Sequence, residues 1–295
     1  MSELRIDALL PAEMATRAEY LGVRKAEMPA LKMFMLAVLA GAFISLGAIF
    51  ATTVSAGGMA ISAADGAAAF STGLPFGVTR LLAGLVFSLG LILVVVGGAE
   101  LFTGNNLIVM AWASRKVSTL ALLRNWVIVY AGNFVGSIGT VFLMLMTRQY
   151  TFGASAVGIA ALKTAVAKCE LTFLQALALG ILCNALVCLA VWMTFSARST
   201  TDKILAIIFP ITAFVAAGFE HSIANMYFVP YGLFLAQFDP QFVASVAGKV
   251  PHLEALTWGN FLVNNLIPVT LGNIIGGAGL VAAAYWAIFL HQNEN

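Results

Sequence analysis

Six long apolar stretches, separated by short polar segments, dominate the pattern along the chain. A helix needs about 20 mainly apolar residues to cross a bilayer, and each stretch is long enough. Strands of a membrane barrel would instead alternate in short segments, which this sequence does not do. The pattern predicts an all-α, multi-pass membrane protein whose six spans are Met33–Val54, Leu81–Ala111, Trp126–Met146, Phe173–Phe195, Ile204–Phe238 and Phe261–Leu290.

Two of these spans, the second and the fifth, are too long and too interrupted to be single helices. The second contains GGAELFTGNN at 97–106, and the fifth contains GFEHSIAN at 218–225. Glycines and polar residues at this depth predict breaks whose free backbone groups face a cavity or pathway. A charged group there costs about 2.5–3.5 kcal/mol, so Glu220 and His221 should have a partner or a cavity. We predict a permeation site; the plainer alternative is a histidine held between packed helices.

An internal repeat relates the two halves of the chain. The motif N-x6-G-N-x2-G occurs at 125–136 in the third span and again at 265–276 in the sixth, 140 residues later. Gly41 in the first span matches Gly180 in the fourth at an offset of 139. Since each half has three spans, the halves must insert in opposite orientations. The sequence therefore predicts two inverted three-helix repeats with a pathway at their interface.

Composition agrees with a membrane protein and narrows the classes of function. The chain is 61% hydrophobic and 9% charged, whereas soluble domains carry about 25% charged residues. The net charge of +2 gives no reason to expect nucleic acid as a partner. Neither metal-ligand spacing nor a phosphate-binding loop occurs, so we expect no metal and no cofactor. We also expect no enzyme activity. The alternative is a membrane enzyme with His221 as general base and Glu220 as the second catalytic group. A purely structural scaffold would not explain two polar helix breaks at matched positions in the two halves.

The distribution of Lys and Arg residues predicts the orientation of the chain in the membrane. The N-terminal segment, the loop after span 2 and the loop after span 4 hold ten of the 15 Lys and Arg residues. The positive-inside rule then places both termini in the cytoplasm. We expect an amphipathic segment at 1–29, a channel domain at 30–290 and a cytoplasmic tail at 291–295. A helix from Pro11 would dock its stripe of Met14, Ala18 and Leu21 on the membrane surface or a protomer.

Thr103 in the first break and His221 in the second could face each other across one lumen. Apolar rings around them would dehydrate a permeant, and the two side chains would return one or two hydrogen bonds. Histidine titrates near neutrality, so it can exchange a proton with a weak-acid anion. No ring of carboxylates selects for cations, and no arginine is expected at depth to bind an anion tightly. The permeant implied is small, polar and anionic.

Five stretches in order resemble the formate–nitrite transporter family, and the resemblance covers about residues 30–290. They are GAELFT (98–103), NWVIVYAGNFVGS (125–137), CNALVCLAVWM (183–193), GFEHSIANM (218–226) and NNLIPVTLGNIIGG (264–277). The residues of the last two stretches are most similar to those of the formate channel branch of the family. The resemblance implies an aquaporin-like fold, a homopentamer with one pore per protomer, and a place in the bacterial cytoplasmic membrane. It implies bidirectional, pH-dependent conduction of formate and related small anions; the alternative is a nitrite or hydrosulfide channel.

The same resemblance implies roles for individual residues. Thr103 would lie at the tip of the mobile loop and His221 at the centre of the pore, with Asn184 and Asn273 steadying the two broken loops. The cytoplasmic constriction would consist of Leu91, Leu101, Phe102 and Val187, and the periplasmic one of Phe87 and Phe214. A polar cluster beside the histidine would consist of Lys168, Glu220 and Asn225. Without the family, each apolar residue could simply pack between helices, and Lys168 could be a solvated loop lysine.

Overall fold

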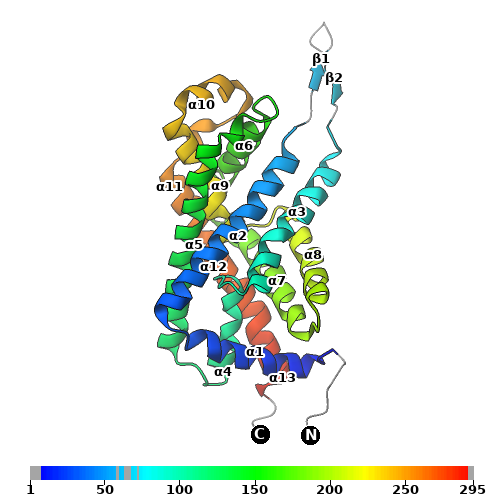
Figure 1. The fold of residues 1–295 in the computed structure, drawn as a ribbon, viewed down its shortest axis with the longest axis vertical. Helices are drawn as coiled ribbons and strands as arrows, with labels where there is room; N and C mark the ends of the chain where they lie inside the picture. Colours follow the sequence, from blue (N-terminus) through cyan, green and yellow to red (C-terminus); the bar gives the residue numbers. More distant parts are fainter. Residues whose placement is uncertain (1–7, 58–59, 63–67, 72, 292–295) are drawn as a thin grey trace.

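The computed structural model describes residues 8–57, 60–62, 68–71 and 73–291, and most of it is a bundle of long helices (Figure 1). Helix α1 (Pro11–Ala26) lies across one end of the bundle, where the described part of the chain, residues 8–291, both begins and ends. We call this the terminal end. At the other end, the hairpin end, strands β1 (Ala60–Ser62) and β2 (Ala68–Ser71) pair antiparallel. The expectations for residues 1–7 and 292–295 fall outside the described residues.

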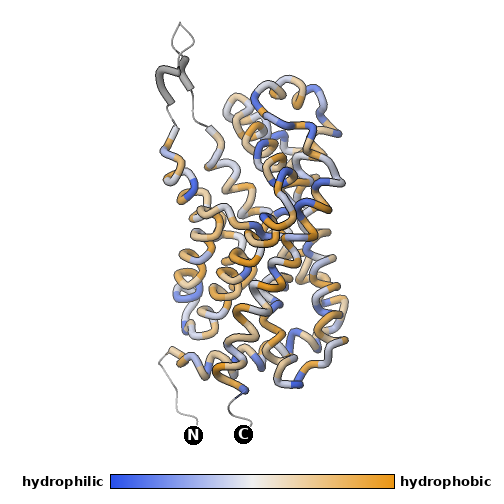
Figure 2. The backbone as a smooth tube through the Cα atoms, turned by 180° about the vertical axis from the view of Figure 1, so that it is seen from behind, coloured by the Kyte–Doolittle hydropathy of each residue, from blue (hydrophilic) through white to orange (hydrophobic). Residues whose placement is uncertain are grey.

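Within the described residues, six helices are long and apolar enough to cross a membrane, as predicted. Five are α2 (Ala30–Ser55), α3 (Phe76–Gly97), α5 (Thr119–Thr147), α7 (Phe173–Ser196) and α8 (Thr200–Ala217). The sixth, Trp258–Phe289, is a composite of α11 (Trp258–Asn260), η5 (Phe261–Leu266), α12 (Ile267–Ile274), η6 (Ile275–Ala283) and α13 (Ala284–Phe289). Figure 2 shows hydrophobic colour along the middle of the bundle and most hydrophilic colour towards its ends.

Both predicted breaks are present, and each follows a glycine in the left-handed conformation. Helix α3 ends before Gly98 (φ 78°), and the chain continues as η1 (Gly104–Ile108) and α4 (Val109–Ala113). Helix α8 ends before Gly218 (φ 79°) and continues as α9 (Ser222–Phe238). A side chain at these φ values would cost roughly 1–2 kcal/mol, which explains the two glycines.

The two halves are related as the repeat predicted, but their register differs from the prediction in one place. The Asn133 amide donates to the carbonyl oxygen of Ala37, and the Asn273 amide donates to that of Gly180. Ala37 therefore corresponds to Gly180, an offset of 143 residues, and the predicted match of Gly41 with Gly180 is wrong by about one helical turn. Small residues recur every three or four positions along α2, so sequence alone leaves this register open.

Several short elements at the hairpin end were not predicted. They are η2 (Gln149–Thr151), α6 (Ala156–Cys169), α10 (Pro240–Val246), η3 (Ala247–Lys249) and η4 (Leu253–Ala255). The Tyr150 hydroxyl donates to the Asp239 carboxylate (2.7 Å), which ties the end of α5 to the corner between α9 and α10. This hydrogen bond, together with the N–H of Phe242 and nearby Arg148, holds the pKa of Asp239 below its ordinary value.

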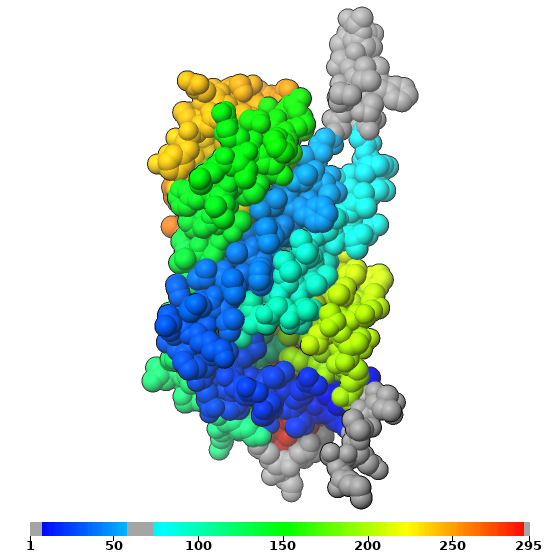
Figure 3. Space-filling view, in the orientation of Figure 1, coloured from blue at the N-terminus to red at the C-terminus, as the bar shows by residue number. Residues whose placement is uncertain are grey.

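Helix α1 begins at Pro11, as predicted, and docks on the helical bundle of its own chain. Met14 and Ala18 are buried among residues of η1, α4 and α7, whereas Leu21 is only partly buried. Lys116 forms an ion pair with Glu19, and the Arg124 guanidinium donates to the carbonyl oxygen of Met28. Figure 3 shows α1, in dark blue, running across the terminal end.

The crossing of α5 over α2 gives a test of the fold. A Cβ at Gly136 would overlap the carbonyl oxygen of Val38, whereas a Cβ at Gly139 would meet no described atom within 4 Å. We expect Gly136→Val to destabilise the protein by more than about 4 kcal/mol and to abolish its folded form. Gly139→Val should keep it. The yield of monodisperse, detergent-solubilised protein measures the difference, and equal yields would contradict the close crossing.

Candidate functional site

The two helix breaks meet at the contact between Thr103 and His221. Thr103 Oγ1 and His221 Nε2 are 3.0 Å apart, and both side chains are buried. His221 Nδ1 accepts a hydrogen bond from the backbone N–H of Ala224 (3.1 Å), so the ring also caps the N-terminus of α9. In the neutral ring this assigns the proton to Nε2, which then donates to Thr103 Oγ1. The Thr103 hydroxyl proton is thereby left for another acceptor.

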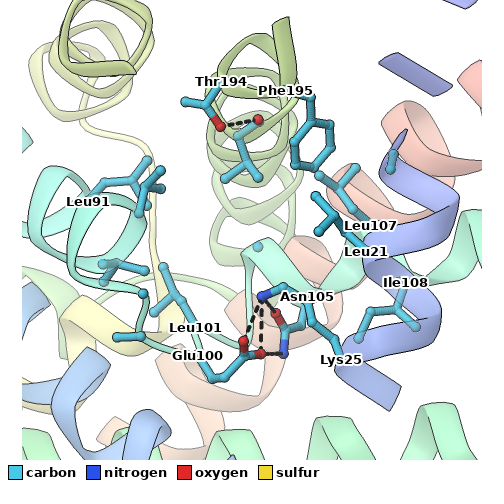
Figure 4. A pocket seen from close by; sticks show the side chains of 18 of the residues that line it. Leu21, Lys25, Leu91, Glu100, Leu101, Asn105, Leu107, Ile108, Thr194 and Phe195 are labelled. Carbon is cyan, nitrogen blue, oxygen red and sulfur yellow. Dashed lines mark hydrogen bonds and ion pairs between the residues drawn. The ribbon is translucent and has the colours of Figure 1, made fainter. Parts of the chain in front are cut away.

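A cavity of about 300 Å³ lies on the terminal side of this contact. Leu91 of α3 and Leu101 of the first break line its apolar part, and Lys25 of α1 points into it beside Glu100 (Figure 4). Helix α1 thus forms part of the wall of this terminal-end cavity, together with Thr194 at the end of α7.

A second cavity, of about 580 Å³, lies on the hairpin side and reaches His221. Phe87 of α3 and Phe214 of α8 line it, and their rings meet edge to face with centroids 5.7 Å apart. The Phe214 ring also stacks on the His221 imidazole at 5.9 Å. Of the apolar residues expected at the constrictions, Phe102 and Val187 are also buried but line neither cavity.

A polar network holds the second break at the hairpin-end cavity. Lys168 Nζ donates to the Glu220 carboxylate (2.8 and 2.9 Å), and so do the side-chain amides of Asn225 (2.6 Å) and Asn265 (3.1 Å). The Asn265 amide also donates to the carbonyl oxygen of Lys168 (3.1 Å). The expected cluster of Lys168, Glu220 and Asn225 is therefore assembled. Its fourth member, Asn265, comes from the repeated N-x6-G-N motif.

An equivalent network, which sequence reasoning missed, holds the first break. Lys25 Nζ donates to Glu100 (2.9 Å) and to Asn105 (2.8 Å), the Asn105 amide donates to Glu100 (2.7 Å), and the Asn125 amide donates to the Lys25 carbonyl oxygen (3.1 Å). The signal was in the sequence. The pattern G-x-E-x4-N occurs at 98–105 and again at 218–225.

Asparagines satisfy the backbone groups that the breaks leave free. Asn133 accepts from the N–H of Phe102 (3.0 Å) and donates to the carbonyl oxygen of Glu100 (2.9 Å). Asn273 accepts from the N–H of Ser222 (2.9 Å) and donates to the carbonyl oxygen of Glu220 (3.0 Å).

Asn184 joins the first loop to α12, because its amide donates to the carbonyl oxygens of Thr103 (3.3 Å) and Asn273 (2.7 Å). Asn184 and Asn273 are fully buried and line neither cavity, so their place is behind the loops, where they hold them. Sequence reasoning named both residues but missed the role of Asn133.

Each cavity is lined by more cations than carboxylates, which favours anions. The terminal-end cavity has Glu100 with three cations, Arg17, Lys25 and Lys203, and the hairpin-end cavity has Glu220 with Arg80, Lys163 and Lys168. Arg80, near the start of α3, is partly buried and lines the hairpin-end cavity. Among the described residues, no group of three or more His, Cys, Asp or Glu side chains could hold a metal ion.

Comparison with known proteins agrees with this geometry. The family described as Formate/nitrite transporter matches residues 12–287. The formate channel FocA of Escherichia coli (strain K12) is 46% identical over 291 residues, covering 98% of this chain and 97% of its own. FocA of Haemophilus influenzae is 41% identical and covers 92% of this chain and 91% of its own. A solved structure of a pentameric formate channel with formate bound has a TM-score of 0.78 and 50% identity, and covers 88% of this chain and 98% of its own.

The Lys25–Glu100 ion pair can be tested by a double-mutant cycle. Lys25→Ala leaves a buried carboxylate without its cation, and because Lys25 is 34% exposed we expect a loss of about 1–2 kcal/mol, below the value for fully buried pairs. Adding Glu100→Gln should recover part of that loss. Arg24→Ala, which removes a charge from the same helix at an exposed position, is the control. Thermal unfolding in detergent is measured for the wild type, both single variants, the double variant and the control, and equal losses for Lys25→Ala and Arg24→Ala would refute the pairing.

Proposed function

Because this chain belongs to the formate/nitrite transporter family, we propose that it is a membrane channel for formate and related small monovalent anions. Relatives named as formate channels, at 41–46% identity over nearly the whole chain, support formate as the permeant. The observation that carries the proposal is the Thr103–His221 contact, which lies between two cation-lined cavities reaching towards opposite ends of the bundle.

The proposed path runs from one cavity to the other past apolar side chains and the central contact. An anion would be concentrated by the cations of the cavity it enters. It would then lose water against Leu91 and Leu101 at one end or Phe87 and Phe214 at the other. The free Thr103 hydroxyl proton and the His221 ring would replace part of that hydration.

Proton exchange between His221 and the permeant would depend on the hydrogen bonds that the two ring nitrogens make, Nε2 with Thr103 and Nδ1 with the N–H of Ala224. A second proton must go to Nδ1, where it displaces the N–H of Ala224 and weakens the cap of α9, a contact worth about 1 kcal/mol. The charged ring attracts a formate ion, and transfer of one ring proton gives neutral imidazole and formic acid. The cap therefore favours the neutral ring between transfer events.

In its cellular setting, the chain is proposed to form a homopentamer in the bacterial cytoplasmic membrane, with one path in each protomer. The solved pentameric channel supports the assembly. The excess of Lys and Arg in the segments that lie at the terminal end supports a cytoplasmic location of both termini. Residues 1–29 would then form the cytoplasmic segment, and its helix α1 lines the cavity at this mouth.

The function is tested by flux into proteoliposomes of the purified wild-type protein. Formate, nitrite, hydrosulfide and chloride are compared at equal gradients, with protein-free liposomes as control. We expect formate to enter fastest and chloride slowest. Nitrite or hydrosulfide exceeding formate by tenfold would move the chain to another branch of the family.

Thr103 offers a matched pair of variants. Thr103→Val removes the hydroxyl and keeps the shape of the side chain, whereas Thr103→Ser keeps the hydroxyl. Since a neutral hydrogen bond is worth about 0.5–1.5 kcal/mol, we expect Thr103→Val to lower formate flux by roughly two- to tenfold with the folded oligomer retained. Thr103→Ser should stay near the wild-type rate. If Thr103→Ser loses flux while Thr103→Val keeps it, the methyl group rather than the hydroxyl matters.

His221→Asn tests proton exchange. Its side-chain oxygen can still cap α9, but it cannot titrate. We expect the protein to fold and conduct formate, while the dependence of flux on pH that His221 confers is lost. Flux measured at several internal and external pH values decides it. An unchanged pH dependence would reduce the histidine to a structural residue.

A further inference from the structure

Arg80 in the first turns of α3 holds the end of another helix. Its Nε donates to the carbonyl oxygen of Ala216 (3.1 Å), and its Nη2 donates to that of Val215. These carbonyls lie in the last turn of α8, where the helix ends; the Val215 carbonyl oxygen also accepts a hydrogen bond from the N–H of Gly218 (3.1 Å). A cation is also favourable at a helix C-terminus because of the helix dipole. The guanidinium therefore stabilises the C-terminus of α8 from the side of α3.

The same two helices carry the aromatic rings that narrow the hairpin-end cavity. Phe87 lies about two turns along α3 from Arg80, and Phe214 directly precedes Val215 in α8. Their rings are in edge-to-face contact. A hydrogen bond that ties α3 to the last turn of α8 also limits how far these rings can move apart.

The backbone beside Arg80 is shaped for this contact. Gly218, the left-handed residue that ends α8, has no side chain, and a Cβ there would lie 3.1 Å from Arg80 Nη2. A glycine at this position therefore permits the left-handed turn and leaves room for the guanidinium of Arg80.

The terminal end lacks a matching contact among the described residues. Lys203 of α8 lines the terminal-end cavity with Val94 and Gly98 at the end of α3. No hydrogen bond joins Lys203 to that helix end within the described part of the chain. A cation therefore lies near the C-terminus of α3 and another near the C-terminus of α8. Among the described residues, only the C-terminus of α8 is hydrogen-bonded by its cation.

We infer that Arg80 is a positioning residue that fixes the gap between Phe87 and Phe214 and thereby limits the size of the anions that pass. This inference rests on the proposed function. It assigns to Arg80 a role in selection by size that is separate from its charge. A carboxylate with a bulkier substituent than formate's hydrogen needs the two rings to part further, so such anions should respond most when the contact is removed.

The test compares Arg80→Met with Lys163→Met in proteoliposomes, measuring formate, acetate and lactate flux. Lys163 lines the same cavity and has no hydrogen-bond partner among the described residues, so its replacement removes the same charge without freeing a helix end. We expect Arg80→Met to raise the acetate-to-formate and lactate-to-formate ratios by about fivefold or more. Lys163→Met should lower all three fluxes together. Arg80→Lys, which keeps the charge and one donor group, should give an intermediate ratio.

A second measurement does not depend on transport. Amide hydrogen exchange across residues 214–221 should be faster in Arg80→Met than in the wild type and unchanged in Lys163→Met. Unaltered ratios with unaltered exchange would overturn the inference, and so would identical changes in both methionine variants. If Arg80→Met does not fold, the flux ratios and amide exchange of Arg80→Lys are compared with those of Lys163→Met instead. A wild-type protein that does not conduct formate would refute the proposed function, while exchange would still test the contact.

Discussion

A helix that breaks inside a membrane must find protein partners for the backbone groups it frees, since no lipid can supply them. In this fold, Asn133 and Asn273 meet that requirement for the two breaks. Each also binds a carbonyl oxygen of the neighbouring helix in its own half. The loops are therefore fixed to α5 and α12, and the meeting of Thr103 with His221 follows from these bonds. A purely apolar residue at either asparagine would leave the break without a defined position.

The electrostatics of the pathway depend on how the two buried carboxylates are neutralised. Glu100 and Glu220 each bind a lysine and an asparagine amide, so neither presents a free negative charge to an anion. The remaining cations around each cavity then determine the sign of its potential. Along the proposed path between the cavities, the Thr103 hydroxyl and the His221 imidazole are the hydrogen-bonding groups, and apolar side chains flank them. In that proposal, attraction of the anion at the mouths and its dehydration at the centre are separated in space.

The sequence predicted the spans, the breaks and the inverted repeat because each has a strong local signal. Runs of apolar residues, glycines beside polar residues, and a motif repeated at 140 residues need no knowledge of contacts. It did not predict the register of α2 against α7, since small residues in successive turns fit equally well.

Lys25 was counted among the charges of the N-terminal segment, and its contact with Glu100, 75 residues later, depends on how α1 folds back. Helix α6 was missed because its 14 residues are too short to be taken for a span. The family resemblance supplied Lys168 and Asn273. The roles of Asn133 and Arg80 became visible only in the contacts.

The order of the charged residues along the chain has a consequence for biosynthesis. Lys25 precedes Glu100, and Lys168 precedes Glu220, so in both halves the cation is translated before the carboxylate that it neutralises. A ribosome-bound chain therefore already carries a counter-ion at the membrane when each acidic loop emerges. The asparagines at 125 and 265 emerge afterwards and complete each network. The order of the chain thus makes a counter-ion available for each buried carboxylate from the moment that the carboxylate emerges.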